Sequence, residues 1–303
     1  MQPSLDNQDT KLLTANYAFD NADEYARGRY RELSVLYDAR TIRHLERTGI
    51  ERGWRCLEVG GGGGSIASWL CERVGHDGRV VATDLEPRFL QTLPFDNLEV
   101  RKHDIRMEGL PEYQFDLAHS RLVLMHLPGR ELALQRILAS LKPGGWIVLE
   151  EFDTLSVFPD SAVNPDEEEV PILRACYQVL NAHGVDLRYG RRLPLRLLAN
   201  GLVNVGAEAN LSLWKGQSPG TSLFKINFED LADPIIRSGL MSQAEFEAAL
   251  RRFDEQDFHM LSPTMWTAWG QVSEFSPYGA SPNASTTTEN EGAFVEVTCT
   301  TRS

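Results

Sequence analysis

Hydrophobic residues follow two alternating patterns through the first half of the chain. Short apolar runs, of the size of buried strands, are separated by stretches in which apolar residues recur every three or four positions, as on one face of a helix. The strand-like runs are residues 56–59, 79–84, 98–102, 115–121 and 146–150, and helical stretches include 66–74 and 130–141. Strands that alternate with helices predict a parallel sheet covered by helices.

The segment before this region is predicted to be helical. Apolar residues recur with helical spacing between residues 14 and 49, Asn21 or Asp23 can cap the helix, and Gly49 ends it. These aromatic residues lie in its first half: Tyr17, Phe19, Tyr25 and Tyr30. They either pack the helix onto the sheet or fold over a ligand as a lid.

After Asp153 the pattern is less regular. The acidic run 166–169 indicates a helix start, where the helix dipole favours anions, although binding of a cationic substrate is an alternative. That helix ends at Gly184. Further helices are expected at 193–200, 227–238 and 242–255, and further strands at 202–213 and 263–271. From residue 276 polar residues dominate and predict a mobile tail, in which 293–297 can add to a sheet edge.

Composition and charge narrow the class of protein. The chain has 303 residues, enough for one large α/β domain or two small ones, and it lacks both a leader-like N-terminus and the roughly 18 apolar residues of a membrane helix. A net charge of −13 argues against nucleic acids and anionic membranes as partners. The four cysteines follow no metal-binding spacing, so we expect buried thiols, no metal site and a cytoplasmic location.

Five consecutive glycines separate the first strand from the helix that follows it. The stretch runs from Glu58 through the glycines 60–64 to Ser65. Strand, glycine turn and helix bring backbone amides and a helix N-terminus close to a ligand. The stretch does not match the dinucleotide-binding motif, because Ser65 occupies the position of its last glycine. It does not match the phosphate-binding loop either, because the lysine of that motif is missing. A flexible linker is the remaining alternative, but linkers do not join a buried strand to an amphipathic helix.

The pattern that does fit is acidic-x-Gly-x-Gly-x-Gly. Together with FDLAHSRLVLMHLP at 115–128 and LKPGGWIVLEEFD at 141–153, it resembles the motifs of class I S-adenosylmethionine-dependent methyltransferases, in particular the small-molecule enzymes of bacterial secondary metabolism. The resemblance covers about residues 54–153. It implies a Rossmann-like α/β fold with a seven-stranded, mostly parallel sheet whose last strand is antiparallel, helices on both faces, and helical insertions after strands five and six. The expected organisation is a lid segment at 1–50, a methyltransferase domain at 51–275 with a substrate-recognition insertion at about 154–190, and a tail at 276–303.

The expected cofactor is S-adenosylmethionine. Asp84 ends the second strand about 20 residues beyond the glycines, which suits a carboxylate that accepts the ribose hydroxyls, although a helix-capping role is an alternative. The resemblance implies that Asp104 accepts a bond from the adenine amino group, that the amide of Ile105 meets a ring nitrogen, and that Leu85 lies on the adenine face. A turn-forming Asp is the alternative for Asp104. It also implies contacts near the methionyl part from these residues: Glu58, Gly60, Gly62, Gly64 and Ser120. One arginine among Arg27, Arg29 and Arg31 can reach the cofactor carboxylate, and otherwise the three are expected in solvent.

Four residues are candidates for a general base. They are His119 at the end of strand four, and Glu150, Glu151 and Asp153 at the end of strand five. Adjacent side chains on a strand point to opposite faces, so Glu150 and Glu151 cannot both face a cleft unless the strand has ended. His119 titrates near neutrality, which suits a base, and its alternative role is a structural or cofactor contact. His126 and His183 are expected to be structural.

The predicted function is methylation of an oxygen, nitrogen or carbon of a small organic molecule by in-line displacement. A base is needed only when the nucleophile carries a proton. The alternative is a protein of the same fold that binds the cofactor without transferring methyl, such as a cyclase or a regulatory module. A nicotinamide oxidoreductase is a more distant alternative. A homo-oligomer is compatible with the sequence.

Overall fold

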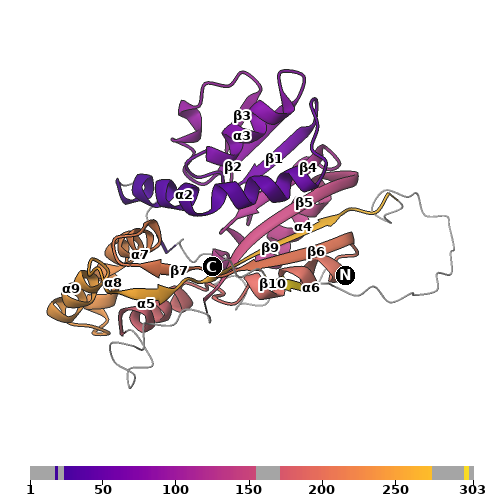
Figure 1. Cartoon of the computed structure of the whole chain (residues 1–303). Helices are drawn as coiled ribbons and strands as arrows, with labels where there is room; N and C mark the ends of the chain where they lie inside the picture. Colours follow the sequence, from indigo (N-terminus) through magenta and orange to yellow (C-terminus); the bar gives the residue numbers. More distant parts are fainter. Residues whose placement is uncertain (1–17, 20–23, 155–170, 275–296, 300–303) are drawn as a thin grey trace.

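The computed structural model describes residues 18–19, 24–154, 171–274 and 297–299 (Figure 1). Its strands are β1 Arg55–Val59, β2 Arg79–Asp84, β3 Leu98–Lys102, β4 Phe115–Arg121, β5 Leu141–Asp153, β6 Val203–Asn210, β7 Leu213–Lys215, β8 His259–Leu261, β9 Thr264–Gln271 and β10 Val297–Cys299. Its helices are α2 Glu24–Arg47, α3 Ser65–Val74, α4 Arg130–Ser140, α5 Pro171–Ala182, α6 Leu193–Ala199, α7 Pro219–Asp230, α8 Ala232–Arg237 and α9 Gln243–Arg252. Short 3₁₀ turns are η1 Leu90–Thr92, η2 Leu124–His126 and η4 Gly190–Arg192.

The main sheet has the order β10-β6-β9-β5-β4-β1-β2-β3. Strands β1 to β5 pair in parallel with their neighbours, whereas β9 is antiparallel to both β5 and β6. This arrangement confirms the predicted seven strands and the antiparallel last strand, to which β10 adds an edge. Because β1 has β2 on one side and β4 on the other, the strand order reverses there, and ligands bind at such a switch point.

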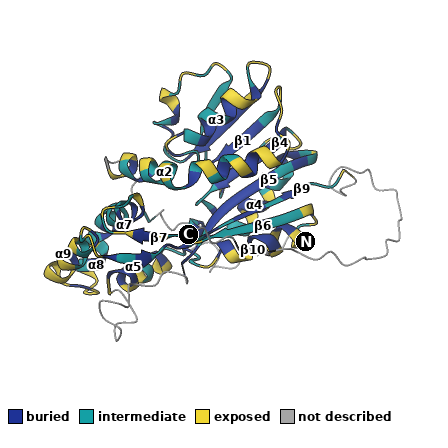
Figure 2. Cartoon of the chain, in the orientation of Figure 1, coloured by how far each residue is buried: buried dark blue, intermediate teal, exposed yellow. Residues whose placement is uncertain are grey.

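Helices cover both faces of the central strands, as predicted. Strand residues alternate between the faces, so each face contributes its own buried cluster. One cluster joins α2 and α3 to the sheet through Leu45, Leu70, Cys56, Val80, Leu117 and Val148. The opposite cluster includes α4 and the alternate strand positions, with Leu134, Ile137, Leu57, Val81, Ala118 and Ile147. Figure 2 shows the resulting dark blue, buried strands between partly exposed helices.

The second half of the chain builds a helical group beside the sheet. Figure 1 shows α5, α7, α8 and α9 gathered beyond one end of the strands, next to the two-stranded sheet of β7 and β8. Helix α2 packs against α7, so the N-terminal helix links the two parts. None of the described helices is long and apolar enough to cross a membrane.

Several element boundaries differ from the predictions. The strand expected at 146–150 is longer, because β5 begins at Leu141 and extends through Asp153. The helix expected at 227–238 begins at Pro219, because Ser218 forms a capping box with Thr221 and proline is favoured in the first turn. The small sheet of β7 and β8 was not predicted. Its strands are short and are far apart in the sequence.

Some predictions fall outside the described residues. These are the caps Asn21 and Asp23, the aromatic Tyr17, and the acidic run 166–169. Of the expected edge strand 293–297, only Val297 is described, and it begins β10, which pairs with β6. Cys56, Cys71 and Cys176 are buried free thiols, as expected, and burial raises the pKa of each.

Candidate functional site

The loop between β1 and α3 turns through three left-handed glycines. Gly60, Gly62 and Gly64 have φ angles of 71°, 50° and 83°, whereas the two glycines between them do not have positive φ. A residue with a Cβ loses roughly 1–2 kcal/mol in this conformation. The alternating glycines of the motif are therefore a requirement of the backbone at three positions.

Neighbouring side chains also leave no room for a Cβ in this loop. A Cβ on Gly60 would lie 2.2 Å from Cγ2 of Val123, and one on Gly62 would lie 2.8 Å from Cε1 of Tyr30. Tyr30 belongs to α2, so this helix packs on the glycine loop. The contact fits both alternatives for Tyr30, packing of the helix and a lid, while Tyr25 is exposed.

Asp84 at the end of β2 holds the glycine loop in place. Its Oδ2 accepts a hydrogen bond of 2.9 Å from the amide of Gly62, and its Oδ1 accepts one of 2.9 Å from the amide of Glu86. Burial raises the pKa of Asp84, and these backbone donors counteract part of that rise. Each carboxylate oxygen has a second lone pair, so the side chain can still accept from a ligand in the cavity. The capping and ligand-binding alternatives are thus compatible.

The loop after β3 offers a backbone donor beside a carboxylate. Among the described residues, none accepts a hydrogen bond from the amide of Ile105, although this residue is buried against the cavity. The adjacent Asp104 is bound by the amide and the guanidinium of Arg106. Burial opposes ionisation of Asp104, but Arg106 outweighs it and holds the pKa of this carboxyl below its usual value.

One cavity of about 510 Å³ joins these features to the helical group. Its volume falls in the range of about 300–1,000 Å³ that is typical of small-molecule sites. Glu58, Asp84, Leu85, Asp104 and Ile105 line one part of it, which we call the donor half. The other part, here called the acceptor half, is lined mainly by apolar residues of η2, α5 and α7, including Met125, Leu173, Cys176, Leu180, Leu223, Phe224 and Phe228.

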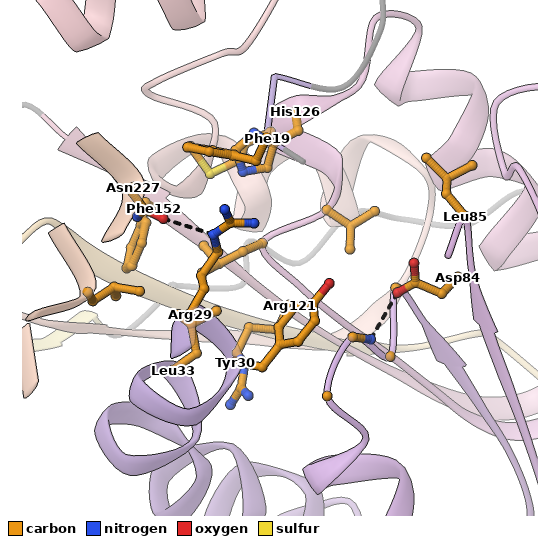
Figure 3. A pocket seen from close by; sticks show the side chains of 18 of the residues that line it. Phe19, Arg29, Tyr30, Leu33, Asp84, Leu85, Arg121, His126, Phe152 and Asn227 are labelled. Carbon is orange, nitrogen blue, oxygen red and sulfur yellow. Dashed lines mark hydrogen bonds between the residues drawn. The ribbon is translucent and has the colours of Figure 1, made fainter. Parts of the chain in front are cut away.

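A polar bridge spans the acceptor half. Arg29 of α2 donates to Oδ1 of Asn227 at 3.0 Å (Figure 3). It also forms an ion pair with Asp230, and both partners lie on α7. The guanidinium also lies 4.7 Å from the centre of the Phe19 ring. Arg29 is only 5% exposed, so the expectation that it lies in solvent was wrong. Its partners are nearly 200 positions away in the sequence.

His126 of η2 lines the same half of the cavity. Its ring makes an edge contact with Phe19, with 5.8 Å between ring centroids, and Figure 3 shows the two side chains together. Burial, with the charges of Arg29 and Arg130, lowers the pKa of His126 to about 3. The imidazole is therefore neutral over the usual working range and can accept a hydrogen bond from a bound molecule, but so low a pKa makes it a weak base.

Comparisons with known proteins agree with this geometry. A family model described as a methyltransferase domain matches residues 25–211, which is more than half of the chain. The chain belongs to the S-adenosylmethionine-dependent methyltransferases. Membership identifies S-adenosylmethionine as the cofactor.

The curated relatives include enzymes from fungi and bacteria. The chain is 30% identical over 148 residues to methyltransferase str2 of Strobilurus tenacellus, which covers 48% of this chain and 52% of that protein. It is 29% identical over 118 residues to the ubiquinone/menaquinone biosynthesis C-methyltransferase UbiE of Nitrosospira multiformis, covering 37% of this chain and 48% of the relative. The chain thus spans about half the length of these relatives.

Solved structures support the fold. The YcgJ protein of Bacillus subtilis superposes with a TM-score of 0.51 at 14% identity, covering 81% of this chain and 99% of that one. BH2331 of Bacillus halodurans superposes with a TM-score of 0.52 at 13% identity, covering 77% and 98%. The methyltransferase fold therefore accounts for most of this chain.

The donor half fits an adenosyl cofactor of this methyltransferase family. The glycine loop lines the cavity with backbone rather than side chains, and the Ile105 amide is a donor with no acceptor among the described residues. The structure places Glu58, Gly60, Gly62, Asp84, Leu85, Asp104 and Ile105 along the cavity. Gly64 is instead the N-cap of α3, and Ser120 is fully buried, with no partner for its Oγ among the described residues. Arg121, Leu122 and Val123 line the cavity where Ser120 was expected.

None of the four predicted catalytic side chains is among the described residues that line the cavity. His119 lies between the carboxylates of Glu58 and Glu150, at 2.8 Å and 3.5 Å. Burial opposes its protonation, but the two carboxylates raise the pKa of His119 to about 9, and His119 in turn helps to lower the pKa of Glu150 to about 2 against the effect of burial. A charged, enclosed imidazole cannot serve as a base near neutral pH. The catalytic role of these residues stays a prediction without direct access to the cavity.

Glu150 and Glu151 point to opposite faces of β5, as strand alternation requires. Glu151 accepts from the amides of Val123 and Leu124 at 3.2 and 2.7 Å, and burial raises its pKa to about 8. Asp153 forms an ion pair with Arg191 of η4. Both carboxyl groups are thus engaged in holding the segments that surround the cavity.

The sequence analysis missed the residues of the helical group that complete the site. Asn227, Phe224 and Phe228 lie on α7, whose start was misplaced. The capping signal Ser218-Pro219 was available and would have brought these residues into one helix. Their approach to α2 depends on tertiary packing, for which the local sequence carries no signal.

Proposed function

We propose that the chain transfers a methyl group from S-adenosylmethionine to a small organic molecule whose body is mainly apolar. The observation that supports this proposal is the single cavity that joins the glycine loop and Asp84 to the apolar acceptor half. A few polar groups, Arg29, His126 and Asn227, interrupt the apolar wall. A small number of polar groups in an apolar pocket orient a ligand and give specificity.

The chain contributes mainly by alignment. The cofactor would supply a methyl group on a sulfonium sulfur. A nucleophile of the methyl acceptor would take that methyl group by in-line displacement, with the sulfur as leaving group. Tyr30 and Phe19 cover the cavity from the N-terminal side, and the helices α5 and α7 close it from the other. Holding two reactants in such an enclosed site corresponds to effective molarities of about 10⁵ M or more.

His126 is our candidate for a residue that orients a hydroxyl or amine of the methyl acceptor by accepting a hydrogen bond from it. It lines the acceptor half and is neutral, whereas His119 is enclosed and charged. The low pKa that keeps His126 neutral also makes it a weak base, so its role is orientation rather than proton removal. The Arg29–Asn227 bridge lies beside it and can orient the polar end of the acceptor.

Two measurements test the proposed function. Calorimetry with S-adenosylhomocysteine is expected to show binding, and NAD is expected to show none. Incubation of S-adenosylmethionine carrying a labelled methyl group with a panel of apolar phenols and amines is expected to yield labelled product. Binding without transfer to any member of the panel would favour the non-transferring alternative, and no binding at all would contradict the proposal. Assignments to secondary metabolism, to the cytoplasm and to a homo-oligomer stay predictions.

A further inference from the structure

A buried charge cluster crosses the sheet behind the donor half. Glu58 on β1 and His119 on β4 face each other in the strand register, and Glu150 follows on β5. His119 is fully buried, with Nδ1 2.8 Å from Oε2 of Glu58 and Nε2 3.5 Å from Oε2 of Glu150. Both ring nitrogens therefore face carboxylates. A neutral imidazole would turn a lone pair toward one of them, so this arrangement requires the doubly protonated ring.

The two ends of the cluster differ in their remaining partners. Both oxygens of Glu150 are engaged, because Thr267 donates to Oε1 at 2.8 Å and Thr41 donates to Oε2. Glu58 uses only Oε2, and no described residue donates to its Oε1. Glu58 also lines the cavity beside the glycine loop. The free acceptor of the cluster is therefore on the cavity side.

The cluster also has an unbalanced charge. Two carboxylates surround one imidazolium, which leaves one negative charge. The nearby Arg121 offsets part of this charge at the Glu150 end, but its guanidinium is shared with Asp38 in an ion pair. A buried charge is stable only when it is paired, so a cation is expected at the accessible oxygen of Glu58.

We propose that His119 is a positioning residue that holds Glu58 by one oxygen, so that its other oxygen receives the cationic methionyl end of the donor. The inference rests on the proposed function, since it presumes that the donor half binds S-adenosylmethionine. It assigns His119 a role in donor affinity. The imidazole acts through Glu58 and takes no part in proton transfer to or from the acceptor.

Two substitutions of His119 distinguish this role from simple packing. The amide nitrogen of asparagine can replace Nδ1 and keep the bond to Glu58, whereas the amide nitrogen of glutamine replaces Nε2 and keeps the bond to residue 150. Both are made in a Glu150→Gln background, so that loss of the imidazolium does not leave a second buried carboxylate unpaired. The readout is the Kd for S-adenosylhomocysteine, which retains the ammonium, measured by calorimetry beside thermal unfolding.

We expect the Kd of the His119→Asn variant to stay within about threefold of the Kd of the Glu150→Gln reference. The Kd of the His119→Gln variant is expected to be higher by about tenfold or more, as loss of a bond to a charged group implies. Equal affinities for the two variants would overturn the inference. If neither variant folds, Glu58→Gln in the wild-type chain must weaken binding by about tenfold, and unchanged binding would overturn the inference.

His44 provides a matched control. It is buried on α2, stacks on Trp269 with 5.2 Å between centroids, and does not line the cavity. His44→Asn and His44→Gln are expected to bind S-adenosylhomocysteine as the wild type does, and a contrast between them as large as that at position 119 would overturn the inference. A wild-type chain that binds neither S-adenosylmethionine nor its demethylated form would instead refute the proposed function itself.

Discussion

At the scale of single residues, Gly62 combines two constraints. It has a left-handed φ of 50°, and a Cβ there would meet the ring of Tyr30 at 2.8 Å. Gly49 has a φ of 79° but open space where a Cβ would lie. Substitution of either glycine strains the backbone, but only substitution of Gly62 can also disturb the donor half.

We therefore expect Gly62→Ala and Gly49→Ala each to lower the free energy of unfolding by roughly 1–2 kcal/mol. Only Gly62→Ala is expected to weaken binding of S-adenosylhomocysteine, by about tenfold, because Tyr30 and the loop must move apart. Urea unfolding and calorimetry measure the two effects. The same Kd in both variants would contradict the assignment of the glycine loop to the donor.

His126 offers a test of substrate orientation at one residue. His126→Leu is expected to raise the KM for the methyl acceptor by about fivefold, as loss of a hydrogen bond implies, while leaving the Kd for S-adenosylhomocysteine unchanged, because the residue lines the acceptor half. His183→Leu is the control, since its Nδ1 lies 2.9 Å from the carbonyl of Val179 and it does not line the cavity. An unchanged KM in the His126 variant would remove it as an orienting residue.

Glu151 makes stability depend on pH. Burial raises the pKa of Glu151 to about 8, above its value of about 4.3 in an unfolded chain. Between these values the folded state keeps a proton that the unfolded state loses, so this group contributes less stability as pH rises from about 4.3 to 8. Glu151→Gln removes this dependence. The stability of the variant relative to wild type is expected to increase between pH 5 and pH 8 in urea unfolding, and a constant difference would show that Glu151 is ionised in the fold.

At the scale of elements, the contact of α2 with α7 closes the acceptor half. Arg29 and Asp230 form its ion pair, with both side chains less than 10% exposed. Local sequence patterns predicted that α2 is a helix but placed its arginines in solvent, because a pattern of residues along one helix does not reveal the helix that packs on it. The glycine loop, in contrast, was predicted correctly, since its spacing is set by its own backbone.

Asp230→Asn is expected to reduce the free energy of unfolding by about 3 kcal/mol, because it removes a buried carboxylate that pairs with a buried guanidinium. Asp233→Asn removes an ion pair with Arg237 whose side chains are both more than 70% exposed, and it is expected to change stability by less than about 0.5 kcal/mol. Urea unfolding of the two variants gives the comparison. Similar losses would mean that the Arg29 pair is solvated.

At the scale of the whole molecule, the fold assigns the two halves of the cavity to different parts of the chain. The alternation of strands and helices was visible in the sequence because packing in the sheet and its covering helices gives apolar residues a short, regular spacing along each element. The acceptor half was not, because it forms where η2, α5 and α7 meet α2, and its members are scattered from Phe19 to Phe228. The catalytic candidates were chosen from strand ends because the strands could be located in the sequence, whereas the acceptor half could not. The structure places His119 and Glu150 inside the sheet.

This division predicts that donor and acceptor binding can be changed separately. Phe89 lies in the donor half, with the guanidinium groups of Arg27 and Arg88 at 5.3 and 4.6 Å from its ring centre. Phe224 lies in the acceptor half against Trp214.

Phe89→Leu is expected to weaken binding of S-adenosylhomocysteine by about three- to tenfold, since it removes an aromatic surface worth about 0.5–1.5 kcal/mol. Phe224→Leu is expected to leave that Kd unchanged while shifting the affinity for an apolar probe such as 1-anilinonaphthalene-8-sulfonate. The two substitutions are chemically identical, so their different effects can arise only from position. If both variants change both affinities equally, the cavity acts as one undivided site, and the assignment of α7 to the acceptor must be abandoned.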